Sequence, residues 1–589
     1  MCGIAGLLQF DGRQPDLARL QRIVDAQAAR GPDGAGVLAR QRVAFGHRRL
    51  KIIDLSDRAQ QPMSDPELGL DIVFNGCIYN YAALREELVQ LGYRFFSRGD
   101  TEVVLKALHA WGPQAVERFN GMFAFACHQQ DSGRVLLARD RLGIKPLYLA
   151  AGEGGLAFAS SLPALLAGGA VDTALDPVAL NHYLSFHAVV PPPHTLLRGV
   201  RKLPPATLRC IEPDGSHSDS RYWQLRVAED PQDRRSDAEW EQALLDALRA
   251  AVRRRMVADV PVGVLLSGGV DSSLIVGLLA EQGQAGLNTF SVGFETVGDI
   301  EGNEFRYSDL VAQTFGTAHH RIPVPTEHLL DSLPATIRAM SEPMVSHDNV
   351  GFYLLSQAVA QHLKVVQSGQ GADEIFAGYH WYPPLVDSGD AVGDYLREFA
   401  DRDFAEYGQV VQAPWLERDY ARELVASRFG SDAGASALDR ALQLDTTVML
   451  VDDPVKRVDN MTMAAGLEAR VPFLDHEVVE LAARIPGALK LADGGKGILK
   501  SVARRIVPPA VIDRPKGYFP VPELTYIRGS VYDYVQAALG SERARSRGIY
   551  NRDYVDTLLA DPETDITPLG GSKLWQLALL ELWLQEHGL

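Results

Sequence analysis

A cysteine at position two has the residue type and the place of a catalytic nucleophile. Small residues after an initiator methionine normally allow its removal, which would put the thiol of Cys2 beside its own α-amine. A free α-amine has a pKa of about 7.7–8.0, so near neutral pH it can accept the thiol proton, directly or through water. The segment MCGIAG is equally compatible with a structural cysteine in a buried first strand.

Two glycine-rich segments have the composition of phosphate-binding loops. SGGVDSS, at 267–273, joins an apolar strand to a helix, so its backbone N–H groups and the helix N-terminus can receive phosphate oxygens. It lacks the lysine of the GxxxxGK[ST] loop. A glycine pair in a turn is weak evidence, but SGGxDS after an apolar strand is much more specific. The second segment, SGQGADE at 368–374, carries two carboxylates and an uncharged Gln370 at its centre.

The first part of the chain, up to about residue 205, reads as short strands separated by Gly, Pro and Asp turns. Examples are residues 42–54, 70–80, 121–129 and 133–140. One clear helix, 80–93, has leucines on one face. Strands with few helices predict a layered, mainly antiparallel sheet domain.

The later part alternates apolar strands with helices. Residues 261–266, 287–294 and 363–367 are apolar strands, each followed by helical sequence. This repetition predicts a doubly wound parallel α/β sheet, whose ligands bind at the carboxyl ends of the strands. From Trp415 onward the sequence is mostly helical. A Pro-rich passage and a polar stretch between the parts predict a first domain at 1–205, a linker at 206–235 and a second domain at 236–589.

Several segments of the first part resemble the glutaminase domain of class II, N-terminal-nucleophile amidotransferases. They are MCGIAG, RGPDG, GHRRLKIID, FNGCIYN, RGDTEV and ARDRLGIKPLY, in the family's order over roughly 160 residues. The resemblance implies a layered αββα fold and Cys2 as the nucleophile on the glutamine amide. It also implies an oxyanion hole made by the Asn75 side chain and the Gly76 N–H, which supplies several kcal/mol of barrier lowering.

The same resemblance implies a glutamine site. Arg49 would bind the α-carboxylate of glutamine and Asp100 its α-ammonium, with Leu50, Ile53 and Cys77 lining the pocket. Each residue has a simpler interpretation: the arginine pair at 48–49 as a solvated pair, and DTE at 100–102 as a helix cap. Cys77 stands where many relatives carry Glu, and we interpret it as a packing residue.

SGGVDSS resembles the signature of the ATP pyrophosphatases, which split ATP to AMP and pyrophosphate and leave an adenylylated substrate. The resemblance implies that Asp271 and Asp373 hold Mg²⁺, because carboxylates on two loops suit a hard cation that bridges phosphate oxygens. ATP and Mg²⁺ are thus expected, with no tightly bound organic cofactor. The implied ATP and pyrophosphate site comprises Leu265, Ser267, Gly268, Gly269, Asp271, Ser272, Ser273, Val292, Ser368 and Gly369.

Three later segments match the asparagine-synthetase branch of this superfamily: AGLEARVPFLDHEVVELA, GKGILKSVARRIVP and DRPKGYFPVP. They imply that Lys516 is the essential lysine, which stabilises charge on phosphate and on the acyl centre. We rank Lys496 and Lys500 below it, since a lysine on a helix face is usually only solvated. Arg470 and Asp475 are as compatible with a structural role as with a catalytic one.

Cys2 and SGGVDSS on one chain imply a glutamine-dependent asparagine synthetase over the whole length. Glutamine would be hydrolysed at Cys2, and ammonia would pass through the interior to an acyl-adenylate. Glucosamine-phosphate synthases and phosphoribosyl amidotransferases share only the first domain. Storage or β-lactam-forming relatives are expected to lack Cys2 or the loop aspartates, which are present here.

The segments around Gln370 and at 339–357 resemble most the N-acetylglutaminylglutamine amidotransferases, which make an osmoprotectant dipeptide amide. Aspartate is the alternative acceptor. Gln370 stands where aspartate-using members carry a Glu tied to adenylate formation, and a neutral amide neither acts as a base nor repels a second carboxylate. Gln370 is therefore a catalytic candidate. Further residues expected to line the acceptor site are Glu342, His347, Asp348, Asn349, Tyr353 and Tyr379.

The overall composition limits the partners. The 589 residues carry a formal net charge of −17, which argues against a nucleic-acid or anionic-membrane partner. The first residues, MCGIAGLLQF, show no basic leader and no cleavage-site pattern, so we expect no secretory signal. No apolar run approaches the roughly 18–20 residues of a membrane helix. The four cysteines are scattered, so we expect a reducing cytoplasm. Glutamine, ATP and a carboxylate acceptor are the expected partners, and a homodimer is left open.

Overall fold

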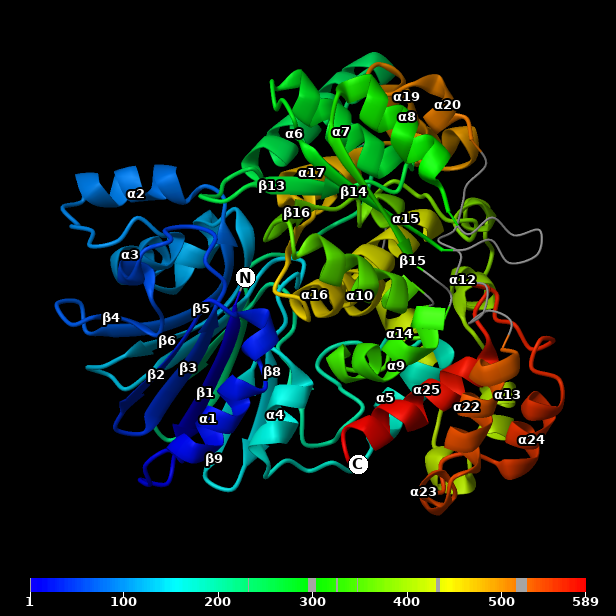
Figure 1. Cartoon of the computed structure of the whole chain (residues 1–589), viewed down its shortest axis with the longest axis horizontal. Coiled ribbons are helices and arrows are strands. Elements are labelled where there is room, and N and C mark those ends of the chain that lie inside the picture. The colour runs from blue at the N-terminus through cyan, green and yellow to red at the C-terminus, as the bar shows by residue number, and fades with distance from the viewer. Residues whose placement is uncertain are drawn as a thin grey trace.

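The computed structural model describes residues 2–230, 232–294, 303–324, 327–346, 348–430, 435–514 and 527–589. Figure 1 shows a β-rich part in blue and cyan beside a larger part in green to red. We call residues 2–221 the N-terminal half and residues 236–589 the C-terminal half. No helix within the described ranges has the length and apolar character that a bilayer crossing needs.

The N-terminal half contains two six-stranded antiparallel sheets, in the orders β10-β8-β9-β1-β3-β2 and β12-β11-β7-β6-β5-β4. Their strands are β1 (Gly3–Gln9), β2 (Gly34–Arg40), β3 (Val43–Arg49), β4 (Met63–Asp65), β5 (Leu70–Ile78), β6 (Gly121–Gln129), β7 (Val135–Arg139), β8 (Tyr148–Gly152), β9 (Gly155–Ala159), β10 (Arg201–Lys202), β11 (Thr207–Ile211) and β12 (His217–Arg221).

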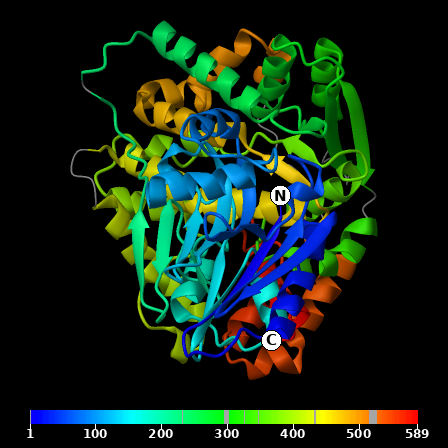
Figure 2. The same ribbon diagram turned by 90° about the vertical axis from the view of Figure 1, so that its left-hand side faces the viewer.

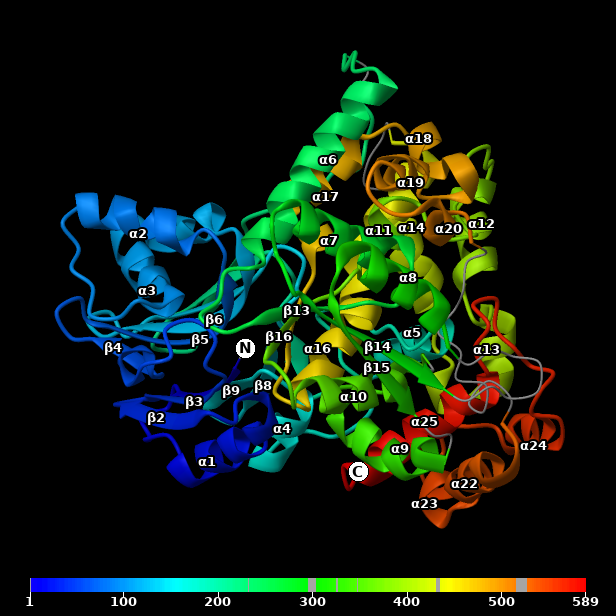
Figure 3. The same cartoon turned by 45° about the horizontal axis from the view of Figure 1, so that its top comes forward.

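The two sheets pack face to face because successive side chains of a strand point to opposite faces. In β6, Ala124 and Ala126 face the first sheet, while Phe123, Phe125 and Cys127 pack beneath the helices. The helices α2 (Tyr81–Gln90) and α3 (Asp100–Trp111) cover one outer face, and α1 (Leu17–Asp25) and α4 (Leu162–Gly168) cover the other. Figure 3 shows these four layers in section, which confirms the predicted αββα arrangement.

Two segments cross the predicted division of the chain. β11 and β12 lie within the stretch 206–235 that we predicted as a linker, and there they extend the second sheet beside β7. The helix α5 (Pro177–Ser185) leaves the sheets and reaches the C-terminal half, where the Tyr183 hydroxyl donates to the carbonyl of Gln576 at 2.8 Å. The domain boundaries at 205 and 236 stay a prediction.

The C-terminal half is built on a five-stranded parallel sheet in the order β15-β14-β13-β16-β17. Its strands are β13 (Val262–Leu265), β14 (Asn288–Phe294), β15 (Ala318–Val324), β16 (Val365–Gln367) and β17 (Glu468–Arg470). Val264 and Leu266 pack with α6 and α7 on one face, whereas Leu265 packs with α10 on the other. Helices therefore cover both faces, and the predicted doubly wound sheet is confirmed.

Helices make up most of the remaining chain, as the sequence after Trp415 predicted. They are α6 (Asp237–Arg254), α7 (Val270–Glu281), α8 (Phe305–Phe315), α9 (Glu327–Ala339), α10 (Asp348–Val359), α11 (Ala372–Ile375), α12 (Ala391–Phe399), α13 (Phe404–Val410), α14 (Tyr420–Phe429), α15 (Ala437–Leu444), α16 (Lys456–Met463), α17 (His476–Arg484), α18 (Gly487–Leu491), α19 (Gly497–Arg504), α20 (Pro509–Ile512), α22 (Gly529–Gly540), α23 (Glu542–Ser546), α24 (Arg552–Ala560) and α25 (Lys573–Glu586).

The two halves meet at the end of the parallel sheet where the strands β13 and β16 begin. Leu50 and Ile52 pack with Val262 and Val365, the first residues of β13 and β16. Buried ion pairs also cross this contact: Arg30 of the N-terminal half lies 2.9 Å from Asp459 on α16. Figure 2 shows the strands of the N-terminal half in front of the C-terminal half. The chain's N-terminus thus lies beside β13 and β16 in Figures 1 and 3.

Candidate active sites

The first site forms where the start of β1 meets β5. Cys2 is buried, and its backbone N–H donates to Asn75 Oδ1 at 3.0 Å. The other amide atom, Asn75 Nδ2, is buried without an acceptor among the described residues. Gly76 follows on β5, and a Cβ added there would lie 2.2 Å from the Met122 carbonyl. Gly76 lines the pocket of Cys2, and the residue that binds the Cys2 backbone, Asn75, carries an amide donor left unpaired by the described residues. The oxyanion hole formed by these two residues stays a prediction.

Burial raises the pKa of the Cys2 thiol, and the charge of Glu468 adds to this rise. The charge of the chain's N-terminal amine, a hydrogen bond from the Leu50 backbone and the charge of Arg49 oppose it. A buried thiol with a raised pKa is a poor nucleophile until a base takes its proton. The α-amine that removal of Met1 would create stands within the same residue and can supply that base.

All but one of the predicted glutamine-binding residues line a pocket of about 40 Å³ together with Cys2, and the exception is Asn75. Arg49 is buried and donates to the carbonyls of Asp54 and Ser56, which fix its guanidinium. Asp100 begins α3 and accepts from the Ile78 N–H at 3.1 Å; burial raises its pKa to about 6. The structure also brings Leu50, Ile53, Gly76 and Cys77 to this lining.

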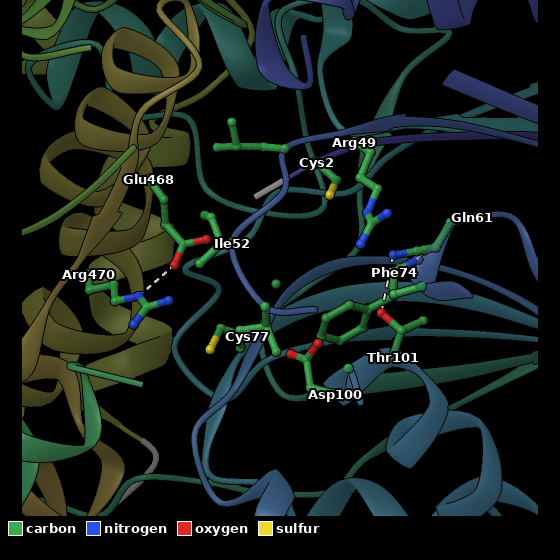
Figure 4. Close-up of a pocket in the computed structure, with 15 residues that line it drawn as sticks. Cys2, Arg49, Ile52, Gln61, Phe74, Cys77, Asp100, Thr101, Glu468 and Arg470 are labelled. Atoms are coloured by element: carbon green, nitrogen blue, oxygen red, sulfur yellow. Dashed lines mark hydrogen bonds and ion pairs between the residues drawn. The ribbon is translucent and has the colours of Figure 1, made fainter. Parts of the chain in front are cut away.

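Two residues of the C-terminal half complete this pocket. Glu468 and Arg470, on β17, line it together with Cys2. Figure 4 shows both reaching the pocket from the gold ribbon at the left, across from Arg49. Sequence reasoning did not place them here. The spacing of the two charges was the available signal, because residues two apart lie on one face of a strand.

The second site lies at the carboxyl ends of β13, β14 and β16. Its cavity, of about 470 Å³, is lined by most of the predicted ATP-site residues: Leu265, Ser267, Gly269, Asp271, Ser272, Val292, Ser368 and Gly369. Gly269 is the N-cap of α7, so the free N–H groups of that helix open towards the cavity. Gly268 adopts a φ of 77°, and Ser273 is fully buried; both shape the loop without lining the cavity.

A lysine joins the two predicted metal ligands. Lys496 Nζ lies 2.7 Å from Asp271 and 2.8 Å from Asp373. Lys496 has a left-handed backbone, φ 57°, and its N–H donates to Phe376 O at 3.1 Å. Such strain in a non-glycine residue is typical of functional sites. We ranked Lys496 below Lys516, which lies outside the described residues; the signal we underrated is the DGGKG turn that holds this lysine away from a helix face.

The carboxylates of Asp271 and Asp373 are of the ligand type that suits the expected Mg²⁺. They converge within the reach of one cation, as their contacts with Lys496 demonstrate. The described residues contain no group of three or more His, Cys, Asp and Glu side chains able to hold a metal alone. Mg²⁺ commonly binds through one or two carboxylates together with substrate phosphates, so Asp271 and Asp373 suit a metal that arrives with ATP.

The acceptor residues that we expected fall into four groups. Asp348 and Tyr379 line the second cavity, as does Gln370. Asn349 is buried and binds backbone carbonyls, and neither it nor Tyr353 lines that cavity. Glu342 lies at the contact between the halves, where it accepts from the Leu196 N–H at 3.0 Å. His347 lies outside the described residues.

One acceptor-side residue escaped the sequence reasoning. Arg457, on α16, lines the cavity and lies 3.2 Å from Asp348. Burial raises the pKa of Asp348, and the charge of Arg457 offsets part of this rise. On the same wall the Tyr379 hydroxyl donates to Glu374 at 2.8 Å. A cation and an anion thus stand together beside the phosphate loops.

Comparisons with known proteins cover the whole chain. A family model described as asparagine synthase matches residues 243–585, and one described as a glutamine amidotransferase domain matches residues 1–223. Glutamine-hydrolysing asparagine synthetase 1 of Bacillus subtilis is 30% identical over 99% of this chain and 96% of its own. A putative glutamine-hydrolysing asparagine synthetase of Mycobacterium bovis is 33% identical over 94% and 91%. The amidase chyE of Penicillium rubens is 25% identical over 97% and 96%.

Proposed function

Because this chain belongs to the glutamine-hydrolysing asparagine synthetase family, we propose that it hydrolyses glutamine at Cys2 and transfers the ammonia to an acyl-adenylate formed in its C-terminal half. The chain is a carbon–nitrogen ligase that takes its nitrogen from glutamine. The observation that carries the residue assignments is the presence of both sites, a buried thiol beside an unpaired amide donor and a cavity ringed by two phosphate-type loops.

In the first site, the α-amine of Cys2 takes the thiol proton and the sulfur attacks the glutamine carboxamide carbon. The oxyanion that develops is stabilised by Asn75 Nδ2 and by the Gly76 N–H. Arg49 and Asp100 hold the two α-charges of glutamine, which places the carboxamide against the sulfur. Support for these roles comes from the shared pocket and from the unpaired Asn75 amide.

In the second site, ATP activates the acceptor carboxylate as an acyl-adenylate and releases pyrophosphate. The N-terminus of α7 and the loop at 267–272 would receive phosphate oxygens. Asp271 and Asp373 would hold Mg²⁺, which supplies charge neutralisation on the phosphates when bound. Lys496 provides a fixed positive charge between the loops, where negative charge develops on phosphate.

The acceptor that we propose is N-acetylglutaminylglutamine, with aspartate as the second candidate. Gln370 lines the cavity and is uncharged, which favours a carboxylate other than that of aspartate. Aspartate is favoured by the names of the relatives and by the pair Arg457 and Asp348, which matches the two α-charges of an amino acid. A relative that matches almost the full length of this chain is named an amidase, so proteins with this degree of similarity do not all carry the name asparagine synthetase.

The experiment that tests this function measures AMP and pyrophosphate release with glutamine, ATP and Mg²⁺. Aspartate and N-acetylglutaminylglutamine are supplied in separate reactions, and the amide product is identified by mass. Turnover with the dipeptide alone supports the proposed acceptor, and turnover with aspartate alone overturns it. Absence of acceptor-dependent pyrophosphate release with either carboxylate would remove both candidates.

A further inference from the structure

Glu468 is an acidic residue of the C-terminal half inside the pocket of the N-terminal half. It is 1% exposed and lines the cavity that contains Cys2. Its negative charge raises the pKa of the Cys2 thiol and also that of Asp100, beside the burial that dominates both. Glu468 therefore faces the reacting sulfur closely enough to act on it electrostatically.

The carboxylate of Glu468 is fixed in direction. Arg470 Nε donates to its Oε1 at 2.5 Å. The guanidinium is held in turn by the carbonyls of Arg255 and Val257, at 2.8 and 2.7 Å. The Glu468 backbone pairs with Val365, and its N–H donates to Lys364 O at 2.8 Å. A carboxylate that a fixed guanidinium holds at one oxygen, on a strand fixed by its backbone pairing, is a preorganised hydrogen-bond acceptor.

Figure 4 sets Glu468 on the side of the pocket that faces the C-terminal half. Arg49 and Asp100, the predicted partners of the glutamine α-charges, come from the N-terminal half. With glutamine bound between them and Cys2, the remaining wall stands next to the nitrogen that must leave. That wall carries Glu468.

We propose that Glu468 is a catalytic residue of glutamine hydrolysis: it accepts a hydrogen bond from the leaving nitrogen and receives ammonia on the side that faces the acyl-adenylate site. The inference rests on the proposed function of Cys2. The sulfur of Cys2 bonds to the carboxamide carbon, the C–N bond breaks, and the nitrogen takes the proton that the thiol gave up, leaving as NH₃. Water then cleaves the thioester to glutamate and restores the thiol.

A substrate whose leaving group carries no N–H can distinguish this role of Glu468 from a purely structural one. Glutamate γ-methyl ester has the same acyl part and the same α-charges, but its leaving oxygen carries no hydrogen. Loss of an acceptor for the leaving nitrogen should therefore slow hydrolysis of glutamine and spare the ester. A distorted pocket would slow both substrates.

The test compares the wild type, Glu468→Gln and Glu468→Asp on both substrates, with glutamate release as the readout. Glu342→Gln is the matched control, since Glu342 is also fully buried at the contact between the halves but does not line the Cys2 pocket. Formation of the amide from free ammonia and ATP reports whether each variant keeps its C-terminal site.

Glu468→Gln is expected to lower kcat for glutamine about 10- to 100-fold, the range of a hydrogen bond to a charged acceptor, and to change kcat for the ester less than about twofold. Glu468→Asp should recover part of the loss, and it gives the same comparison if the Gln variant does not fold. Glu342→Gln should leave the ratio of the two rates as in the wild type. Equal losses on both substrates, or no loss on glutamine, would overturn the proposal. If Cys2→Ala hydrolyses both substrates like the wild type, the assignment of Cys2 itself fails.

Discussion

Arg470 and Ser368 link the two candidate sites, because each residue lines one of the sites and a backbone hydrogen bond joins them. The side chain of Arg470 lines the pocket of Cys2, while its main-chain carbonyl accepts a hydrogen bond from the Ser368 N–H at 2.8 Å. Ser368 is the first residue of the SGQGADE loop and lines the second cavity. The short strand β17 therefore borders both sites.

Replacing Cys2 by alanine should separate the two reactions. We expect Cys2→Ala to lower glutamine-dependent amide formation by at least about 10³-fold, because no nucleophile remains to form the thioester. Amide formation from free ammonia should change less than about twofold, since Cys2 does not line the second cavity. The measurement is amide product per minute with each nitrogen source. Loss of both activities would contradict a role confined to the first site.

The carboxyl group of Asp100 predicts an acidic limb in the pH profile of glutamine hydrolysis. Burial raises its pKa to about 6, and only the ionised form pairs with the α-ammonium of glutamine. Protonation of the Cys2 α-amine already lowers kcat/KM below a pH of about 7.7–8.0, and protonation of Asp100 should add a second, steeper fall below about pH 6. Asp100→Asn should raise KM about 10- to 100-fold, the cost of losing a charged hydrogen bond, and should remove this second fall. A second fall that persists unchanged in the Asn variant would assign it to another group.

The sequence predicts those features that depend on neighbouring residues, such as a strand and the two faces it buries. The alternation of phenylalanine and alanine along β6 indicates a strand between two layers, and the structure has it. The place of Glu468 depends on contacts between segments more than 400 residues apart in the chain, which no local pattern records. Glu342 shows the reverse case: it stands near acceptor-site residues in the sequence, but its side chain turns to Leu196 and Lys202 of the N-terminal half.

We predict that replacing Lys496 lowers the activity of the second site and spares that of the first. Replacing it by methionine keeps the length of the side chain and removes the charge that bridges Asp271 and Asp373. We expect Lys496→Met to lower pyrophosphate release about 10²-fold or more, because a fixed charge at the reacting phosphate is lost. Glutaminase activity measured with Cys2 intact should remain. Lys573→Met is the control, because Lys573 pairs with Glu406 at 2.6 Å and does not line the second cavity.

The ion pairs of Asp459 predict a cost in stability at the contact between the halves. Asp459 lies 2.9 Å from Arg30 and 3.3 Å from Lys145, and all three side chains are buried. Asp459→Ala leaves two buried cations without their partner, which costs about 3–5 kcal/mol in the free energy of unfolding. Urea unfolding of the variant and of the wild type measures this difference. A surface pair such as Arg397 with Asp394 serves as the control, and breaking it should cost about 1 kcal/mol or less.

The uncharged side chain of Gln370 leads to a prediction about which carboxylate the enzyme amidates. It lines the second cavity beside Asp373 and Glu374, and burial together with the charge of Asp373 raises the pKa of Glu374 to about 7. A third carboxylate, introduced by Gln370→Glu, would repel a second acidic group and offer a base that the amide lacks.

We therefore expect Gln370→Glu to lower kcat/KM for N-acetylglutaminylglutamine about tenfold and to raise the ratio of aspartate to dipeptide turnover. Gln370→Asn, which keeps the neutral amide, is the matched control and should keep the wild-type ratio. The measurement is acceptor-dependent pyrophosphate release with each carboxylate at several concentrations. If the ratio is the same in all three proteins, position 370 does not select the acceptor, and the pair Arg457 and Asp348 becomes the place to look, because it is the other charged feature of that wall.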